Sequence, residues 1–379
     1  MSKTIVVPLV APPLDVAKVS QQALPIARAL VARSDAHVTL VSVIEVPREY
    51  AALVGALGLE SSVRQDWVEE RREFLEQIAR TFPEGRATVV VRVGDPASEI
   101  LDLIQGIDDP VVVMTSHVRT GLQRALLGSV AYRVVHEAEC PTIVIPVSSE
   151  VTGSETARLQ RILVPLDGSS FCEQAIEHVL TVLGPQGLEL HLLHVIEPPT
   201  LHPGFTAQEY MAKAGDWATA YLAGVIERLG HRGITAEAEV RTGRVAEEID
   251  RAAQDSGADM IAMATHSRRG LRRVVFGSVP ERVLRETRVP LFLHHPTASV
   301  QVDAARPADA TAAPSEPRLV SEVMIPPVMA VREGATLAEA EQLMREHDIE
   351  MLPVVDWRSR LVGVIRRSDL PEKRDEASG

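Results

Sequence analysis

The stretch at residues 114–130, MTSHVRTGLQRALLGSV, returns at residues 263–279 as MATHSRRGLRRVVFGSV. A second pair of matching segments, VRVGDPASEI at 91–100 and VRTGRVAEEI at 240–249, keeps the same spacing to the first pair. No insertion therefore separates the matching segments within either copy. Self-similarity at a fixed distance is the sequence signature of a duplicated structural unit. The sequence predicts two copies of one domain.

Within the second copy, short apolar runs rich in β-branched residues alternate with longer helical patterns. The predicted strands are residues 161–166, 189–196, 235–241, 260–264 and 290–294. The predicted helices are residues 172–183, 207–230, 245–256 and 279–286. Strands and helices in alternation indicate a parallel sheet covered on both faces. We expect two tandem doubly wound α/β domains, residues 1–150 and 158–296, whose apolar last strands would suit edge-to-edge pairing between the copies.

The composition changes after the second copy. Residues 297–317 are crowded with Ala, Pro, Asp and Thr and lack apolar periodicity, which is typical of a linker. Residues 318–371 are expected to form a small α+β element, which about 50 residues can stabilise only with a partner surface. Its predicted helix is residues 337–345, its predicted strands are residues 351–356 and 361–365, and a charged tail follows at 372–379.

Charge and composition limit the function classes. The 379 residues contain 39 Lys and Arg against 52 Asp and Glu, a net charge of −13. Phosphate neutralisation needs clustered Lys and Arg, so this balance argues against a nucleic-acid partner. No apolar run approaches the roughly 18 residues of a membrane span, and no secretory leader pattern opens the chain, so we expect a cytoplasmic protein. Cys140 and Cys172 form no CxxC pair, which favours packing thiols over a disulfide or metal cage.

Polar groups follow two predicted strand ends in the second copy. Asp167 follows the first strand, and Gly277 and Ser278 open the helix after the fourth. Ligands of open parallel sheets bind outside the carboxyl ends of the strands, where an Asp can accept from ribose or adenine and a helix start can bind phosphate. The structural alternative is that Asp167, Gly168 and Ser169 cap the next helix while Gly277 makes a tight turn. Spacing alone leaves both interpretations open.

Both copies resemble the universal stress protein family over nearly their whole length. The phrases VPLDGS at 164–169, TGR at 242–244, THSRRG at 265–270 and FGSV at 276–279 look like that family's signatures in order. The resemblance implies a fold of the adenine nucleotide α-hydrolase type and an adenine nucleotide ligand, ATP or of the AMP type, with Mg²⁺ accompanying ATP. The implied contacts are Pro165, Leu166, Asp167 and Val195 at the nucleoside and Met263, Ala264, His266, Ser267, Gly277, Ser278 and Val279 around the phosphates.

The chain departs from the family's ATP-binding pattern of Gly, two residues, Gly, nine residues, Gly and then Ser or Thr. In the second copy Ala264 and Ser267 replace the first two glycines. In the first copy Thr115 and Val118 replace them, and Val10 stands in place of the Asp. Glycine permits positive φ and close approach of the backbone to phosphate, which β-branched residues resist. We expect the first copy to have lost nucleotide binding and the second to bind with modest affinity.

No catalytic constellation is recognisable in the sequence. His191 and His194 lie three apart on a predicted strand and so point to opposite faces, where they cannot easily share a metal ion. His117 and His266 recur in equivalent loops without a nucleophile beside them. We therefore expect a regulatory binding protein of the stress-response type and no enzyme, with slow ATP hydrolysis left open. The alternative is an interaction scaffold of the same family that binds no nucleotide.

The C-terminal element resembles a single CBS motif. The resemblance rests on VMIPP at 323–327, HDIEMLPVVD at 347–356 and LVGVIRRSD at 361–369. Such motifs normally work in pairs that bind adenosine-type ligands, so one motif implies pairing between two chains, as a homodimer or higher assembly. By resemblance Asp369 would contact a ribose, whereas Arg366 replaces a small hydroxyl residue. We expect this element to serve self-association or the sensing of an adenosyl ligand.

Overall fold

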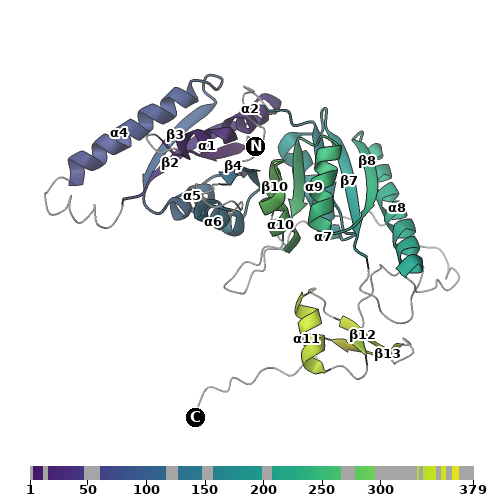
Figure 1. The fold of residues 1–379 in the computed structure, drawn as a ribbon. Coiled ribbons are helices and arrows are strands. Elements are labelled where there is room, and N and C mark those ends of the chain that lie inside the picture. The colour runs from purple at the N-terminus through teal and green to yellow at the C-terminus, as the bar shows by residue number, and fades with distance from the viewer. Residues whose placement is uncertain are drawn as a thin grey trace, which may run out of the picture. The chain divides into compact units, whose positions relative to one another are not determined.

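The computed structural model describes most of both copies and parts of the C-terminal element (Figure 1). The described ranges are residues 3–11, 16–46, 60–116, 127–146, 157–198, 207–265, 278–294, 331–332, 336–346, 351–355 and 361–366. The chain divides into a larger unit, residues 1–197 and 217–306, and a smaller one, residues 198–216 and 307–379. Within the described ranges every helix is too short or too polar to cross a bilayer.

The first copy alternates strands and helices along the chain. Its strands are β1 (Thr4–Pro8), β2 (His37–Ile44), β3 (Ala87–Val93), β4 (Pro110–Ser116) and β5 (Thr142–Pro146). Its helices are α1 (Val16–Ser20), the 3-10 turn η1 (Gln21–Ala23), α2 (Leu24–Arg33), α4 (Glu60–Ala79), α5 (Pro96–Gln105) and α6 (Ser129–Glu137). These strands pair in parallel, as expected for strands joined by crossover helices.

The second copy repeats this order. Its strands are β6 (Arg161–Pro165), β7 (Glu189–Ile196), β8 (Thr235–Thr242), β9 (Met260–Ala264) and β10 (Leu291–His294). Its helices are α7 (Ser170–Leu183), α8 (Ala207–His231), α9 (Val245–Asp255) and α10 (Ser278–Glu286). The predicted element bounds agree with these to within two residues. The largest difference is the start of α7 at Ser170, because the Ser169 hydroxyl accepts the Cys172 N–H at 3.2 Å and caps the helix.

All ten strands of the two copies form one sheet, in the order β3-β2-β1-β4-β5-β10-β9-β6-β7-β8. The copies meet where β5 and β10 pair antiparallel, with Phe292 opposite Ile143. The apolar last strands of the copies therefore pair edge to edge. The predicted fold class, two tandem doubly wound α/β domains with a parallel-dominated sheet, is confirmed.

One apolar core runs through both copies on one face of the sheet. It joins Ile5 and Ile143 of the first copy to Ile162 and Phe292 of the second. Strand neighbours such as Val6 and Leu163 point to the other face, where two smaller cores lie against α5 and α6 and against α9 and α10. Side chains alternate across a strand, so a continuous apolar run in each strand supplies both layers.

The C-terminal element is a small α+β structure. It contains β11 (Val331–Arg332), α11 (Leu337–Glu346), β12 (Met351–Val355) and β13 (Leu361–Arg366). β12 pairs in parallel with β11 and antiparallel with β13. Thr336 and Glu339 form a reciprocal cap, in which Thr336 Oγ1 accepts the Glu339 N–H at 3.2 Å and the Glu339 carboxylate accepts the Thr336 N–H at 2.8 Å.

Candidate functional site

The strand order of the second copy reverses between β6 and β9. From β6 the chain adds β7 and β8 on one side, and then β9 and β10 on the other. The helix after β6, α7, contributes to the larger core, whereas the helix after β9, α10, contributes to the core on the opposite face. The two strands pair in parallel, with Ile162 opposite Met260. The carboxyl ends of two such strands are where doubly wound folds bind ligands, so this edge is the candidate site. Of the predicted site residues, Pro165, Leu166, Asp167, Met263 and Ala264 lie at this edge.

The turn after β6 is built around Asp167. Its Oδ1 accepts the Ser169 N–H at 2.9 Å and the Ser169 hydroxyl at 2.6 Å, and Ser169 in turn caps α7. Gly168 has φ +91°, a conformation that glycine adopts without strain. The structural interpretation of these residues, helix capping, is thus observed. The Asp167 side chain nevertheless remains on the exposed surface of the edge.

An aromatic group covers this turn. A Cβ added to Gly168 would lie 2.4 Å from Cη2 of Trp217, so the indole of α8 packs directly on the glycine. Trp217 contacts the ring of His194 edge to face at 5.4 Å and stacks on Tyr221. The sequence analysis missed this group. The spacing of Trp217 and Tyr221, four apart on a helix, is the signal that could have placed them on one face.

His194 belongs to the same cluster. Its Nδ1–H donates to the carbonyl of Leu166 at 2.8 Å, since a carbonyl can only accept. Burial lowers the pKa of His194, with smaller opposing effects from this hydrogen bond and from Asp167. The imidazole is therefore neutral at pH 7, and one of its nitrogens is committed to the backbone. It stiffens the end of β7 next to the Asp167 turn.

The phosphate side of the predicted site is only partly within the described ranges. Ser278 is exposed and Val279 half-buried at the start of α10. Met263 and Ala264 are each 7% exposed and belong to the apolar cores, and Val195 packs partly against the same core as Met263. His266, Ser267 and Gly277 lie outside the described residues, as does Asp369 of the C-terminal element.

The first copy holds the equivalent turn differently. The N–H of Val10, which stands where the second copy has Asp167, donates to the buried hydroxyl of Ser20 at 3.0 Å. The side chain of Ser20, the residue before η1, thus stabilises the turn. No carboxylate is present at the position of Val10. Thr115 is buried at the end of β4, and Val118 lies outside the described residues.

Neither cysteine has the environment of a nucleophile. Burial raises the pKa of both Cys140 and Cys172 to about 12, so both thiols stay protonated at neutral pH. Nearby Asp167 adds to the effect at Cys172. In the part of the chain that the structure describes, no three His, Cys, Asp or Glu side chains are placed to hold a metal ion.

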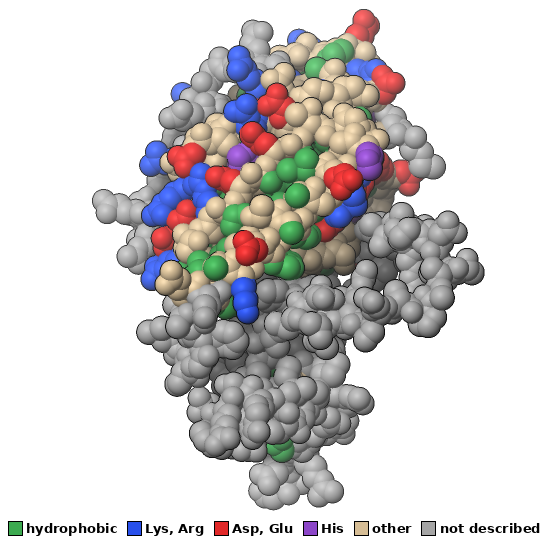
Figure 2. Space-filling view, turned by 90° about the vertical axis from the view of Figure 1, so that its right-hand side faces the viewer, with side chains coloured by type: hydrophobic (Ala, Val, Ile, Leu, Met, Phe, Trp, Pro, Cys, Tyr) green, Lys and Arg blue, Asp and Glu red, His purple; other side chains and the backbone are tan. Residues whose placement is uncertain are grey.

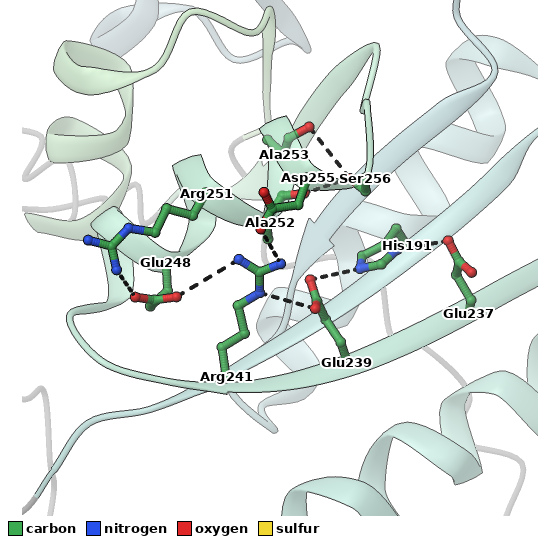
Figure 3. A network of polar contacts seen from close by, with 10 residues as sticks. All are labelled: His191, Glu237, Glu239, Arg241, Glu248, Arg251, Ala252, Ala253, Asp255 and Ser256. Carbon is green, nitrogen blue, oxygen red and sulfur yellow. Dashed lines mark hydrogen bonds and ion pairs between the residues drawn. The ribbon is translucent and has the colours of Figure 1, made fainter.

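His191 lies in a polar network that ties β7, β8 and α9 together (Figure 3). Its Nδ1 is 2.9 Å from Glu237 and its Nε2 is 3.0 Å from Glu239. Arg241 extends the network to Asp255 at 2.9 Å. Ionised carboxylates only accept hydrogen bonds, so a ring nitrogen that carries a proton donates to the carboxylate beside it. The sequence argued against a metal ion shared by His191 and His194 but did not predict this network. The alternating Glu237 and Glu239 of the next strand were the missed signal, since only the strand register places them beside the ring.

Glu237 provides a pH-dependent test of this network. The hydrogen bond from His191 lowers the pKa of Glu237 from its ordinary value of 4.5. A carboxyl with a lowered folded-state pKa contributes stability above its unfolded pKa and loses it as the pH falls through the folded value. Glu237 is 67% exposed, so Glu237→Gln should reduce the free energy of unfolding at pH 7 by less than about 1 kcal/mol. The reduction should vanish at a pH well below that lowered pKa.

Urea unfolding at both pH values measures the effect, with Glu227→Gln on the exposed face of α8 as the control. An equal loss at both pH values would show that Glu237 acts through something other than its charge.

Taken together, the duplicated strand order and the helices on both faces of the sheet define a tandem of doubly wound α/β domains followed by a small α+β element. The family model "Universal stress protein family" matches residues 1–146 and again residues 158–295. The model of the CBS domain matches residues 320–373. This chain belongs to the universal stress protein family, and it carries a CBS domain after its two family domains.

Relatives and solved structures agree with this assignment. The chain is 30% identical over 189 residues to a universal stress protein of Mycobacterium tuberculosis, a match that covers 48% of this chain and 61% of the relative. It is 31% identical over 141 residues to one of Methanocaldococcus jannaschii, covering 35% of this chain and 81% of the relative. A universal stress protein structure from Archaeoglobus fulgidus shares the fold, with a TM-score of 0.57 at 20% identity, covering 77% of this chain and 98% of that one.

Proposed function

We propose that this chain is a cytoplasmic regulatory protein of the stress response that binds an adenine nucleotide, ATP or of the AMP type, in its second copy. The supporting observation is the exposed carboxylate of Asp167 at the carboxyl end of β6, beside the end of β9. A carboxylate there can accept hydrogen bonds from ribose hydroxyls or the adenine amine. α10 lies in the chain between the parallel strands β9 and β10, so its start is at the carboxyl edge of the sheet, where helix N–H groups favour phosphate.

The proposal assigns one nucleotide to each chain. In the first copy Val10 replaces the carboxylate, and its N–H is already bonded to Ser20. An apolar, β-branched side chain at this position offers a nucleoside no hydrogen bond. The second copy alone combines an acidic residue after its first strand with the Gly-Ser pair at its last helix. Mg²⁺ would accompany bound ATP by neutralising its phosphates.

The proposed role is binding and not catalysis. The Cys172 thiol beside Asp167 is protonated at neutral pH, and His194 is neutral with one nitrogen donating to Leu166. The protonated thiol is no activated nucleophile, and the His194 ring packs against Trp217 and is held by the backbone carbonyl of Leu166. A bound nucleotide would instead act as a signal that changes the surface around α10. Slow hydrolysis is the remaining catalytic alternative.

A second candidate function is that of an interaction scaffold without nucleotide. The capping of α7 by Asp167 and Ser169 favours it, because that role alone explains both side chains. The replacement of two family glycines by Ala264 and Ser267 points the same way.

The CBS domain is proposed as a self-association element, with adenosyl-ligand sensing as its alternative role. The described part of this domain has one helix and three short strands, a small amount of structure for an independent core. Pairing with the CBS domain of a second chain would bury its exposed surface.

Titration of labelled ATP against the full chain tests the nucleotide proposal. We expect one ATP per chain and binding about 10-fold to 100-fold weaker for Asp167→Ala, because hydrogen bonds to an ionised group are lost. Asp167→Asn retains one acceptor oxygen for the turn, so its affinity for ATP should lie between those of wild type and Asp167→Ala. Asp102→Ala, at an exposed position of α5 in the first copy, is the matched control. Unchanged binding by Asp167→Ala, or two nucleotides per chain, would refute this site, and no binding by the wild-type chain would leave the scaffold.

A further inference from the structure

The ten-stranded sheet ends in β3 on one side and β8 on the other. Among the described strands, each of these has a neighbour on one side only. An edge strand presents a row of backbone N–H and C=O groups to any strand that can approach it, and proteins commonly protect such edges with charge. The two edges of this sheet differ in that protection.

Every second residue of β3 directs its backbone N–H and C=O groups away from β2, toward the open edge. The Arg86 carbonyl accepts the Val38 N–H at 2.8 Å, and the Gly94 N–H donates to the Ile44 carbonyl at 3.1 Å. Even-numbered residues therefore direct their backbone groups toward β2. In a parallel pair the alternate residues face away, so Ala87, Val89, Val91 and Val93 present theirs at the open edge.

The side chains of β3 leave this edge unprotected. Ala87, Val89 and Val91 pack partly on the larger core, and Val90 packs partly on the core of the opposite face. The only charged residue of the strand is Arg92, whose guanidinium is already 3.2 Å from Glu99.

The other edge, β8, carries two carboxylates, Glu237 and Glu239. Figure 2 views the side of the molecule on which α8 and β8 lie, where acidic and basic side chains are interspersed. The Gly243 N–H donates to Ile196, so the even-numbered residues of β8 face outward. Antiparallel pairing of β8 with itself centred on Ala238 would place Glu237 opposite Glu239. Pairing centred on Glu239 would place that residue opposite its own copy. Like charges directly opposite each other are destabilising.

We propose that β3 is a self-association edge, which pairs antiparallel with β3 of a second copy of this chain about a two-fold axis at Val90. In that register Val89 lies opposite Val91, Ala87 opposite Val93, and Thr88 opposite Arg92. All four outward residues become hydrogen-bonded pairs, and Val90 faces itself in a non-hydrogen-bonded pair. No like charges oppose each other, and the half-buried valines of both edges are covered.

A groove beside β3 fits this occupant. It measures about 560 Å³ and lies between the end of α4 and the first half of β3. Ala79, Phe82, Ala87 and Val89 line it, with Glu76 and Arg80 also present. The proposed register brings Val93 and Val91 of the second copy alongside Ala87 and Val89, on the face where the groove lies. Two branched side chains would thus enter a space that small Ala87 leaves open.

Disulfide trapping in the full chain tests the register. Cα atoms of a non-hydrogen-bonded antiparallel pair lie about 4.5 Å apart, within the range that a disulfide spans. Val90→Cys is therefore expected to form a covalent dimer on mild oxidation. Thr88→Cys is the control, because four residues of stagger place its two copies roughly 13 Å apart. We expect trapping of Val90→Cys to be at least about tenfold faster. Wild type, whose two cysteines are largely buried, gives the background.

A charge pair tests the same interface without cysteine chemistry. Thr88 is exposed and contacts His37 and Thr39 at 3.3 Å each, contacts that Thr88→Arg and Thr88→Glu lose equally. Thr88→Arg faces Arg92 of the second copy with like charge, whereas Thr88→Glu attracts it. Sedimentation of the full chain should show that Thr88→Arg associates at least about fivefold more weakly than Thr88→Glu. Equal masses for both variants, or equal trapping rates for the two cysteine variants, would overturn the proposal. Equal trapping rates are also what pairing of β3 with β8 would give, because neither cysteine would then meet its own copy.

Discussion

Replacing Phe292 with Ala is expected to lower the free energy of unfolding of both copies together by about 3–5 kcal/mol. Phe292 is 0% exposed and heads the largest fully buried side chains. It lies on β10 opposite Ile143 of β5, inside the core that the two copies share. Its loss leaves a cavity at the junction of the copies. Because that core is continuous, we expect one cooperative transition and not two.

Urea unfolding can follow the copies separately. The chain has three tryptophans, of which Trp67 lies in α4 of the first copy and Trp217 in α8 of the second. Variants that keep only one of these two should report the same shifted midpoint in the Phe292→Ala background. Phe74→Ala, at a half-buried position of α4, is the matched control with a smaller loss. A Trp67 transition that stays at its wild-type midpoint would contradict the shared core.

Gly168→Ala is expected to destabilise the protein by about 3 kcal/mol. Two costs combine at this position: alanine is strained at φ +91°, and its Cβ would lie 2.4 Å from the Trp217 ring. The indole cannot yield easily, because it packs against His194 and Tyr221. We expect a lower urea midpoint and altered Trp217 fluorescence in the native state.

Gly187→Ala separates the two costs. Gly187 also has a positive φ, +66°, but a Cβ there meets nothing within 4 Å. Its replacement should cost only the backbone strain, about 1 kcal/mol, and leave Trp217 fluorescence unchanged. Equal losses for the two variants would mean that the Trp217 contact adds nothing to stability.

The fold was predictable because its signals are local or repeated. Strands such as β7 and β9 are short apolar runs, and the predicted bounds of both agree with the structure at each end. Boundaries set by a capping side chain were less accurate, as at Ser169, since a cap is a single hydrogen bond and not a pattern. The duplication repeats the same order of strands and helices in the sequence. Each copy ends in an apolar strand, and these two strands pair at the junction.

The candidate site was predictable only where it follows strand ends. Asp167 and Ala264 lie at the carboxyl edge because a parallel sheet places all such ends together. The packing of Trp217 on Gly168, and of Glu237 and Glu239 around His191, depends on how distant segments align. Composition and periodicity carry no information about that alignment. His266, Ser267 and Gly277 remain predictions outside the described residues.

The antiparallel junction of β5 and β10 has a consequence for how the two halves change over evolutionary time. Two separate, identical subunits joined at such a seam must accept every substitution twice, so a pocket lost in one is lost in both. Here both sides of the seam belong to one polypeptide. The two copies are therefore present in equal amounts, and each is at a high effective concentration relative to the other. One half can then exchange its acidic residue for Val10 while the other retains Asp167. Covalent fusion thereby permits the two copies to carry different residues at equivalent positions of one nearly symmetric sheet.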